Sequence, residues 1–360
     1  MNTKAKNNLF AKLAFYQAEI NLGSTGKNPS VGCVVEQNGS IISSGQTSLN
    51  GRPHAEYNAL KKKKRFNNSN IFVTLEPCSH YGVTPPCTKI IIKKKIKKVY
   101  FPIYDIDERT SKKSKRIFKR NKIDLNTGLL NSYAKKFYES YHLNKKKKIP
   151  LIDAKIAISK DYFSINKKNK WISNNHSLKR GHLIRSRYDC ILSTSKTINT
   201  DNSKLDCRIE GLENKSPDII IIDRKLKLKR STKISEIKKR KIILFTQTNN
   251  KKKENYLKKK NIRIVKISKM NNKLDFLNIF RRLNSLGYTR ILVESGLIFL
   301  KFLHKNKIIN NLYIFKSSYK LKKKGKNNCK SFFIKNIKNE KIIKVNLFGD
   351  KLLKKSFKNV

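Results

Sequence analysis

Acidic residues are scarce in this sequence of 360 residues: 24 Asp and Glu stand against 84 Lys and Arg, a formal net charge of +60. Such an excess favours nucleic-acid binding, because a basic surface releases counterions when it meets phosphates. The lysine clusters, however, are spread over both halves of the chain and have almost no aromatic residues among them. They lie at 61–64, 93–95, 145–148, 251–253, 258–260 and 322–324. We therefore interpret the charge as a drift toward Lys, Asn and Ile, and expect no specific nucleic-acid partner, although nonspecific polyanion binding can follow.

Cysteines and long apolar runs are also few. Six cysteines do not make a disulfide framework in a chain of this length, so we expect reduced thiols and a cytoplasmic location. No apolar run approaches the ~18 residues of a membrane span, so no membrane partner is expected. The start, MNTKAKNNLFAKLAFYQ, lacks the apolar core of a secretory signal. We expect it to form a first helix, with Leu9, Phe10, Leu13 and Ala14 on one face and Gly23 near its end.

Residues that can carry chemistry are gathered in 51–88. His54, Cys78 and Cys87 offer one imidazole and two thiolates, three ligands that leave the fourth tetrahedral position of a zinc ion to water. Glu56 follows the histidine in the H-x-E order of the zinc-dependent nucleobase deaminases, whose glutamate moves protons. Zinc lowers the pKa of bound water toward ~7, so hydroxide is available at neutral pH. Hydrolytic deamination is therefore predicted, with Glu56 as proton shuttle; the alternative is a core histidine beside two buried thiols.

The first half of the chain predicts an α/β domain. A hairpin is expected at 31–45, because Asn38-Gly39 separates two apolar runs. A helix carrying His54 and Glu56 follows, with the lysines at 61–64 at its solvated end. Then come a strand at 71–75, the cysteine loop, a helix near 86–95, a strand at 99–103 and a basic helix near 110–120. This αββαβαβ order fits a central sheet covered by helices on both faces.

The tract NKKKKIP at 144–150 is expected to be an exposed domain boundary. The second half again alternates strands with helices, which indicates another α/β sheet. Strands are expected at 151–159, 189–193, 218–223, 241–246, 263–268, 290–294 and 312–316, and helices at 173–187, at 274–287 and from about 297. The remaining lysine–asparagine tracts are interpreted as loops. At 360 residues, about two domains are expected.

The residues of the second half alone indicate only an anion site. No G-x-G-x-x-G occurs, so a Rossmann site has no support. Gly296 follows the strand end at Glu294 and opens a helix, whose first amides suit a dinucleotide phosphate. A glycine at such a turn is more often explained by plain turn geometry, so this signal alone is weak.

Two stretches of the first half resemble a known family. EPCSHYGVTPPC at 76–87 is similar to the pyrimidine deaminase domain of the bifunctional deaminase/reductases of riboflavin biosynthesis, in which eight residues separate the two cysteines. Asn28-Pro29-Ser30-Val31-Gly32 matches the N-P-x-V-G of the same family. The resemblance implies a cytidine-deaminase-like α/β/α domain, expected at 1–146. His80 is then either a substrate contact or a loop histidine, and Asp105 aligns with a family turn whose prolines are absent here.

The second half resembles the reductase domain of the same enzymes, an α/β fold similar to dihydrofolate reductase and expected at 147–360. The matching residues lie in KIAISKD, KWIS, LIRSRYDCILS, KTINTDNSKLDCR and VESG. The resemblance implies that one set of residues meets NADPH: Ala157, Trp171, Thr197, Asp201, Gly296 and the segment up to 302. It also implies a set that holds the phosphorylated substrate: Asn169, Arg185, Leu205, Arg208 and Glu294. Arginine suits this role because its planar fork binds phosphate through two hydrogen bonds.

Three departures from the family pattern fall in this half. Tyr162 stands where relatives have glycine, Asn202 follows Asp201 where they have Asp-Pro, and Leu297 replaces a small residue or proline. Loss of glycine can block the close approach of a backbone to a ligand. We expect these changes to affect the efficiency of the reductase more than its existence.

The resemblance implies two successive reactions. Zinc-dependent hydrolysis removes the 2-amino group of 2,5-diamino-6-ribosylamino-pyrimidin-4-one 5′-phosphate, and NADPH then reduces the ribosyl to a ribityl chain. The expected cofactors are one Zn²⁺ per chain and NADPH, and the expected partner is this small phosphorylated pyrimidine. The oligomeric state is left open, and a homo-oligomer is allowed. Two alternatives remain: a tRNA or other nucleic-acid deaminase, which the net charge favours, and a deaminase whose second half is a non-catalytic structural domain.

Overall fold

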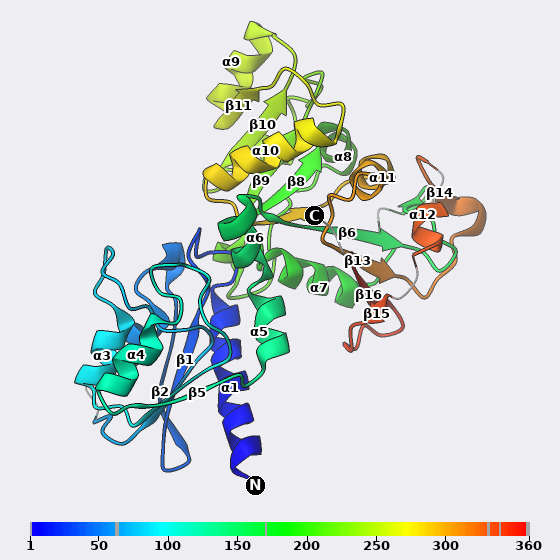
Figure 1. Cartoon of the computed structure of the whole chain (residues 1–360). Helices are drawn as coiled ribbons and strands as arrows, with labels where there is room; N and C mark the ends of the chain where they lie inside the picture. Colours follow the sequence, from blue (N-terminus) through cyan, green and yellow to red (C-terminus); the bar gives the residue numbers. More distant parts are fainter. Residues whose placement is uncertain (1, 62–64, 170, 330–331, 338–339, 358–360) are drawn as a thin grey trace. The chain divides into compact units, whose positions relative to one another are not determined.

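The computed structural model of the chain divides into two compact units, Met1–Ile149 and Pro150–Val360 (Figure 1). It describes residues 2–61, 65–169, 171–329, 332–337 and 340–357. Among these residues, no helix is both long enough and apolar enough to cross a membrane.

The first unit is built on a five-stranded sheet. Its order is β2 (Ser40–Gln46), β1 (Gly32–Gln37), β3 (Asn70–Val73), β4 (Lys98–Phe101) and β5 (Asp124–Thr127). Strand β1 is antiparallel to β2 and β3, whereas β3, β4 and β5 are parallel. The predicted hairpin is confirmed: Asn38 and Gly39 join β1 to β2 with positive φ angles, as a two-residue turn requires. Strand β5 was not predicted, because it is short and largely exposed at the sheet edge.

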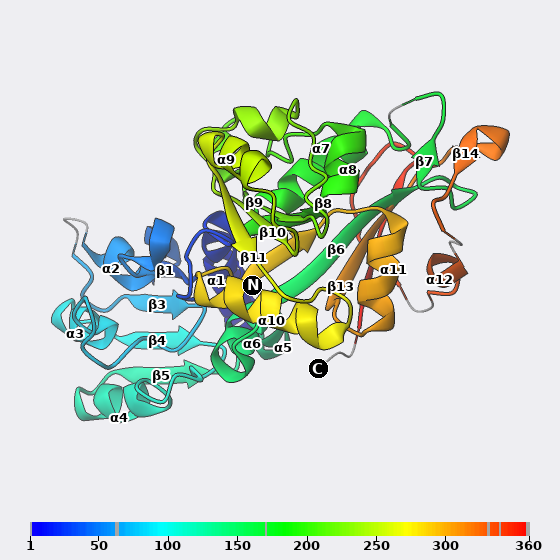
Figure 2. The ribbon, with the colours of Figure 1, turned by 90° about the horizontal axis from the view of Figure 1, so that it is seen from above.

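Helices cover both faces of this sheet, as predicted (Figure 2). Two glycines show how closely they approach. A Cβ on Gly32 would lie 1.9 Å from the carbonyl oxygen of Ala14 in α1 (Thr3–Ile20), and one on Gly45 would lie 2.5 Å from that of Ala55 in α2 (Ala55–Leu60). Neither site has room for a side chain. The other helices are α3 (Cys87–Lys93), α4 (Lys113–Arg120), α5 (Asn131–Phe137) and α6 (Glu139–Lys147), with a 3₁₀ turn η1 at Leu49–Gly51.

One local expectation for this unit was wrong. Leu9 is 44% exposed, because α1 turns its smaller residues and two phenylalanines toward the sheet. The buried residues of α1 are Phe10, Ala11, Ala14, Phe15 and Ala18. The lysines at 145–147 form the last turn of α6, and the division between the units falls after Ile149, within the range 144–150 in which a boundary was expected. Of the run at 61–64, Lys61 caps α2 and is exposed, and 62–64 lie outside the described residues.

The second unit contains a nine-stranded sheet in the order β11-β10-β9-β8-β12-β6-β13-β16-β15. The strands are β6 (Leu151–Ile158), β8 (Cys190–Thr194), β9 (Asp218–Ile222), β10 (Ile242–Thr246), β11 (Ile262–Lys266), β12 (Arg290–Val293), β13 (Asn311–Lys316), β15 (Lys341–Ile342) and β16 (Lys351–Ser356). All neighbours up to β13 are parallel, whereas β16 is antiparallel to β13 and β15. In β9, Ile220 and Ile222 belong to one core cluster and Ile219 and Ile221 to another, so the strand is buried on both faces.

The helices of this unit include those predicted from the sequence and others that were not. They are α7 (Asn175–Arg185), α8 (Ser195–Asp201), α9 (Lys251–Lys259), α10 (Lys273–Ser285), α11 (Leu297–Lys305) and α12 (Phe332–Lys335). Short elements are β7 (Ile165–Asn166) paired with β14 (Gly325–Lys326), and the 3₁₀ turns η2 (Glu213–Lys215), η3 (Lys233–Glu236) and η4 (Lys322–Lys324). The loop expected over the lysines at 251–260 is wrong: α9 forms there and buries Leu257. Lysine is a good helix former, so a basic tract needs only one apolar anchor.

Candidate metal centre and reductase site

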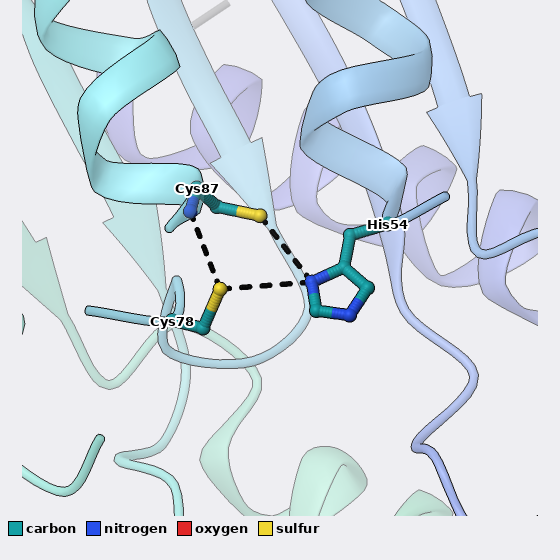
Figure 3. Close-up of side chains that lie close together, drawn as sticks. All are labelled: His54, Cys78 and Cys87. Atoms are coloured by element: carbon teal, nitrogen blue, oxygen red, sulfur yellow. Dashed lines mark hydrogen bonds between the residues drawn. The ribbon is translucent and has the colours of Figure 1, made fainter. Parts of the chain in front are cut away.

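The structure brings His54, Cys78 and Cys87 together (Figure 3). His54 caps the N-terminus of α2, Cys87 opens α3, and Cys78 lies in the loop after β3. The ring atom Nδ1 of His54 faces both sulfur atoms, at 3.6 Å from Sγ of Cys78 and 3.4 Å from Sγ of Cys87. The backbone N–H of Cys87 donates to Sγ of Cys78 at 3.2 Å. Helix starts thus aim two of the three groups at one point.

The donor set and its dimensions fit a zinc ion. Two ligands of one tetrahedral zinc, a sulfur at ~2.3 Å and a nitrogen at ~2.0 Å, lie about 3.6 Å apart. The two nitrogen–sulfur separations match this value, and all three ligand atoms lie within 4.8 Å of one another. The side-chain hydrogen bond between the two thiols lowers the pKa of Cys78 and raises that of Cys87, so one of the two sulfur atoms ionises readily. A thiol that ionises readily is a good zinc ligand.

Glu56 lies beside this cluster in the first turn of α2 and is 3% exposed. Burial raises its pKa to about 7, because the ionised carboxylate loses its water. The carboxyl is therefore suited to take up and return a proton near neutral pH. The alternative of an inert core histidine with two thiols gives no reason for a buried glutamate at this place.

Further residues near the cluster make contacts of their own, and of these the sequence had indicated only His80. Nη1 of Arg52 lies 3.5 Å from Nε2 of His54 and donates to Oγ1 of Thr84 at 2.7 Å. His80 is half-buried, and its Nδ1 is hydrogen bonded to Oγ1 of Thr110 at 3.0 Å. The contacts of Arg52 with Thr84 and of His80 with Thr110 join residues about 30 positions apart in the sequence, so no local motif could have indicated them.

In the second unit, the predicted residues Arg185 and Glu294 are paired. Nε of Arg185 donates to Oε1 of Glu294 at 2.6 Å, and Nη2 donates to Oε2 at 2.9 Å. The ammonium of Lys155 lies 3.7 Å from Oε2 of the same carboxylate. Burial opposes ionisation, but the charges of Arg185 and Lys155 outweigh it and lower the pKa of Glu294 to about 2. Glu294 directly follows β12 and Arg185 ends α7.

Thr197 and Gly296, both predicted to meet the cofactor, also touch. The N–H of Gly296, the residue that caps α11, donates to Oγ1 of Thr197 in α8 at 3.2 Å. Thr197 follows the carboxyl end of β8 and Gly296 follows that of β12, and these two strands are neighbours in the sheet. In parallel α/β sheets this edge is where ligands bind.

The other predicted residues of this unit lie in different surroundings. Leu205 is buried with a positive φ of 49°. Ala157 is a residue of β6 and pairs with Phe315 of β13. Asp201 ends α8 and is exposed. Arg208 has a 60% exposed side chain near Asp206, Trp171 is 49% exposed, and Asn169 is exposed. The structure therefore pairs Arg185 with Glu294 and Thr197 with Gly296, and it brings Arg208 next to Arg185, because both contact His182 and Asp206.

The three departures have structural counterparts. Tyr162 has a φ of 68° and Asn202 a φ of 43°, both in the left-handed region. Glycine suits such a backbone, so the tyrosine keeps the conformation that the family's glycine favours. Lys316 donates to the Tyr162 hydroxyl at 3.0 Å and its ammonium lies over the ring. Leu297 is buried in the core at the start of α11.

Two family descriptions match the chain. The one described as the cytidine and deoxycytidylate deaminase zinc-binding region matches residues 5–103, and the one described as the RibD C-terminal domain matches residues 151–329. The first includes His54, Glu56 and Cys78, and the second includes Arg185 and Glu294.

Whole proteins of known sequence and structure agree with this. The riboflavin biosynthesis protein RibD of Aquifex aeolicus is 31% identical over 290 residues, which cover 80% of each chain. RibD of Chlamydia trachomatis is 28% identical over 309 residues, covering 83% of this chain and 82% of its own.

A solved structure, the diaminohydroxyphosphoribosylaminopyrimidine deaminase/5-amino-6-(5-phosphoribosylamino)uracil reductase of Thermotoga maritima, superposes with a TM-score of 0.82 at 25% identity, over 98% of this chain and 99% of its own. Acinetobacter baumannii RibD has the same fold, with a TM-score of 0.81 at 22% identity over 98% of each chain. The expected fold class, a cytidine-deaminase-like domain followed by a reductase domain, is confirmed. The chain belongs to the RibD family of riboflavin biosynthesis proteins and is a bifunctional deaminase and reductase with zinc and NADPH as its cofactors.

Proposed function

We propose that the two reactions are divided between the two units, deamination in residues 1–146 and reduction in residues 147–360. The observation that carries this proposal is the cluster of His54, Cys78 and Cys87 with the buried carboxyl of Glu56 beside it. All four residues lie in the first unit, whereas the pair of Arg185 and Glu294 lies in the second.

For the deaminase, we propose that Nδ1 of His54 and the two thiolates hold zinc. When bound, zinc makes a water molecule acidic enough to attack the pyrimidine ring at neutral pH. Glu56 would carry one of the two protons of this water to the ring nitrogen and the other to the amino group, which leaves as ammonia. Its raised pKa supports both halves of this transfer, since a group with a pKa near the working pH is an effective proton acceptor and donor. Arg52 and Thr84 tie the loop before α2 to the loop between the two cysteines.

For the reductase, we propose that Thr197, Asp201, Ala157, Trp171 and Gly296 line the NADPH site. The contact between Thr197 and Gly296, at the carboxyl ends of β8 and β12, supports this. NADPH supplies a hydride to the ribosyl carbon. The backbone N–H of Gly296 already has an acceptor in Thr197, so phosphate binding at α11 depends on the amides that follow it.

We also propose that Arg185, Glu294, Leu205, Arg208 and Asn169 hold the phosphorylated pyrimidine. Of the five N–H donors of the Arg185 guanidinium, two bind Glu294 and one binds the carbonyl oxygen of Asp206 at 2.9 Å. Nη1 also lies 3.3 Å from Nδ1 of His182, so most of the guanidinium fork is already engaged. The carboxylate of Glu294 thus orients the guanidinium of Arg185. The side chain of Arg208 is mostly exposed, so of the two arginines it is the better placed to follow a mobile phosphate.

The proposed substrate is 2,5-diamino-6-ribosylamino-pyrimidin-4-one 5′-phosphate, in keeping with the deaminase activity for which the Thermotoga maritima enzyme is named. We propose that no specific nucleic acid and no membrane takes part, and that any assembly joins copies of this chain. The six cysteines are all free, which supports a reducing compartment, and we propose the cytoplasm.

The test is to give purified, zinc-loaded protein this pyrimidine and to measure released ammonia and bound zinc. Wild type should release ammonia, whereas a Glu56→Gln variant should keep its zinc and lose at least ~100-fold in rate, since proton transfer contributes about 10²–10⁴-fold. Zinc retention is the control for folding of the site. Unchanged ammonia release in Glu56→Gln would remove Glu56 from the reaction.

A further inference from the structure

Glu76 is a buried carboxylate with a set of contacts that the proposed chemistry does not use. It lies two residues before Cys78 and is 3% exposed. Oε2 accepts hydrogen bonds from the backbone N–H groups of Asp105 at 3.0 Å and Lys112 at 3.1 Å. Oε1 accepts from the hydroxyl of Ser114 at 2.6 Å and from its N–H at 3.3 Å. One side chain therefore holds both ends of the segment 105–114.

The segment 105–114 in turn touches the loop between the two cysteines. Oγ1 of Thr110 is hydrogen bonded to Nδ1 of His80 at 3.0 Å. The hydroxyl of Ser79 donates to the carbonyl oxygen of Arg109 at 3.5 Å. Thr110 is fully buried, whereas His80 is half-buried. The position of the His80 ring thus depends on a segment whose ends are both fixed by Glu76.

The middle of the segment has its own fastening. Asp107 binds the guanidinium of Arg109 at 2.7 Å and the ammonium of Lys145, from α6, at 2.8 Å. The N–H of Asp107 donates to Oδ1 of Asp105 at 3.0 Å, and Tyr141 donates to the same oxygen at 2.9 Å. The ends of the segment are thus held by Glu76, which follows β3, and its first half is held by Lys145 and Tyr141 of α6.

We propose that Glu76 is a positioning residue of the deamination reaction. It fixes segment 105–114, and through Thr110 it sets the place of His80, in the loop between Cys78 and Cys87, as a contact for the pyrimidine substrate. This inference rests on the proposed deaminase function of the first unit. Glu76 touches none of the three metal-binding side chains in the described structure, so its effect falls on substrate binding rather than on zinc.

A carboxylate is needed at this place because every group that faces it is a donor. Three backbone N–H groups and one hydroxyl point at its two oxygen atoms. In a Glu76→Gln variant the amide nitrogen would face at least one backbone N–H group and could not accept from it, whereas only the Ser114 hydroxyl could turn to accept from the amide. Buried donors that lose their acceptor are costly, so the segment should shift rather than stay in place.

The experiment compares Glu76→Gln with Glu108→Gln in the full-length enzyme. Glu108 lies in the same segment but is exposed, so it is a matched acid-to-amide control. For each protein, bound zinc, KM and kcat for ammonia release, and NADPH oxidation with the deaminated substrate are measured. In Glu76→Gln we expect KM to rise roughly tenfold, as the loss of a buried hydrogen-bond network implies, with zinc content and NADPH oxidation unchanged. Glu108→Gln should behave as wild type.

A second variant tests the route through His80. Thr110→Val keeps the shape of the side chain and removes only the hydroxyl that binds His80. Thr110→Val should also raise KM. The rise in KM of the double variant with Glu76→Gln, expressed as a free energy, should be smaller than the sum of the rises in the two single variants, because both substitutions act on one contact.

The outcomes separate the two levels of inference. Wild-type protein that releases no ammonia would contradict the deaminase function itself. Active wild type with an unchanged KM in Glu76→Gln, or loss of zinc in Glu76→Gln with a normal Thr110→Val, would overturn the role of Glu76 as a positioning residue. Additive effects of the two substitutions would overturn the route through Thr110.

Discussion

The carboxylate of Glu294 and the guanidinium of Arg185 face each other as a fork on a fork, with two parallel hydrogen bonds of 2.6 and 2.9 Å. Both side chains are largely buried, and Lys155 adds a second positive charge to the same carboxylate. A buried ion pair of this kind adds little net stability, because two charges have lost their water. Removing one partner is different, since it leaves the other charge buried and alone.

The variant Glu294→Gln should therefore destabilise the second unit by about 3 kcal/mol at pH 7. Trp171 is the only tryptophan of the chain and belongs to this unit, so its fluorescence during urea unfolding follows the unit by itself. Glu210→Gln, an exposed acid-to-amide change in the same unit, is the control. An equal loss of stability in both variants would show that the buried pair has no special weight.

The same pair predicts a pH dependence. The pKa of Glu294 is lowered from 4.5 to about 2 in the folded chain, so the unfolded chain binds the proton more readily. Its contribution to stability is complete above pH 4.5 and is lost as the pH falls from 4.5 toward 2. Wild type should therefore lose more stability over this window than Glu294→Gln, again measured by Trp171 fluorescence. Parallel curves for the two proteins would contradict the lowered pKa.

Tyr162 allows a test of backbone strain. With φ at 68°, a residue that has a Cβ is disfavoured by roughly 1–2 kcal/mol. Tyr162→Gly should thus be more stable than Tyr162→Ala by about 1 kcal/mol, the reverse of the order at ordinary helix or strand positions, where alanine is favoured. Both variants lose the contact with Lys316, so their difference isolates the backbone. Urea unfolding that gives alanine the higher stability would contradict a left-handed conformation at this residue.

Local signals in the sequence were enough for much of the fold. The dipeptide Asn38-Gly39 indicated the hairpin by its turn geometry, and the strand expected at 218–223 is found as β9, Asp218–Ile222. The lysine tract of α9 was misassigned because charge was taken as a sign of a loop, although Leu257 anchors a helix there. Leu9 was misplaced because α1 packs mainly through alanine and phenylalanine.

The candidate site was predictable only where its chemistry is rare. One histidine, one glutamate and two cysteines in a tight spacing indicated a metal centre, and the structure brings the three ligand residues together. Glu76 and segment 105–114 could not be foreseen, since their hydrogen bonds join residues 29 to 38 positions apart and involve mostly backbone N–H groups. Likewise, the contact of Arg185 with Glu294 spans 109 positions, and only the folded sheet shows that the two bind each other.

The high positive charge predicts salt-dependent but dispensable binding to polyanions. Lys115 and Lys119 are exposed on α4 of the first unit. Changing both to Glu should weaken retention on RNA and reduce its salt dependence, because each lost phosphate contact lowers the slope by about one. Ammonia release from the pyrimidine should stay within about twofold of wild type. A loss of pyrimidine deamination in parallel with RNA binding would instead favour a nucleic-acid substrate.

The presence of both activities on one chain is tested most directly by a single coupled measurement. Purified, zinc-loaded protein is mixed with the diaminopyrimidine ribosylamine phosphate and NADPH, and ammonia and NADPH are followed in the same sample. For wild type we predict ammonia release followed by equimolar NADPH oxidation. In Cys87→Ser both signals should be absent. Supplying the deaminated intermediate to this variant should restore NADPH oxidation alone. If the wild type releases ammonia from the diaminopyrimidine substrate but oxidises NADPH with neither this substrate nor the deaminated intermediate, a bifunctional enzyme is contradicted.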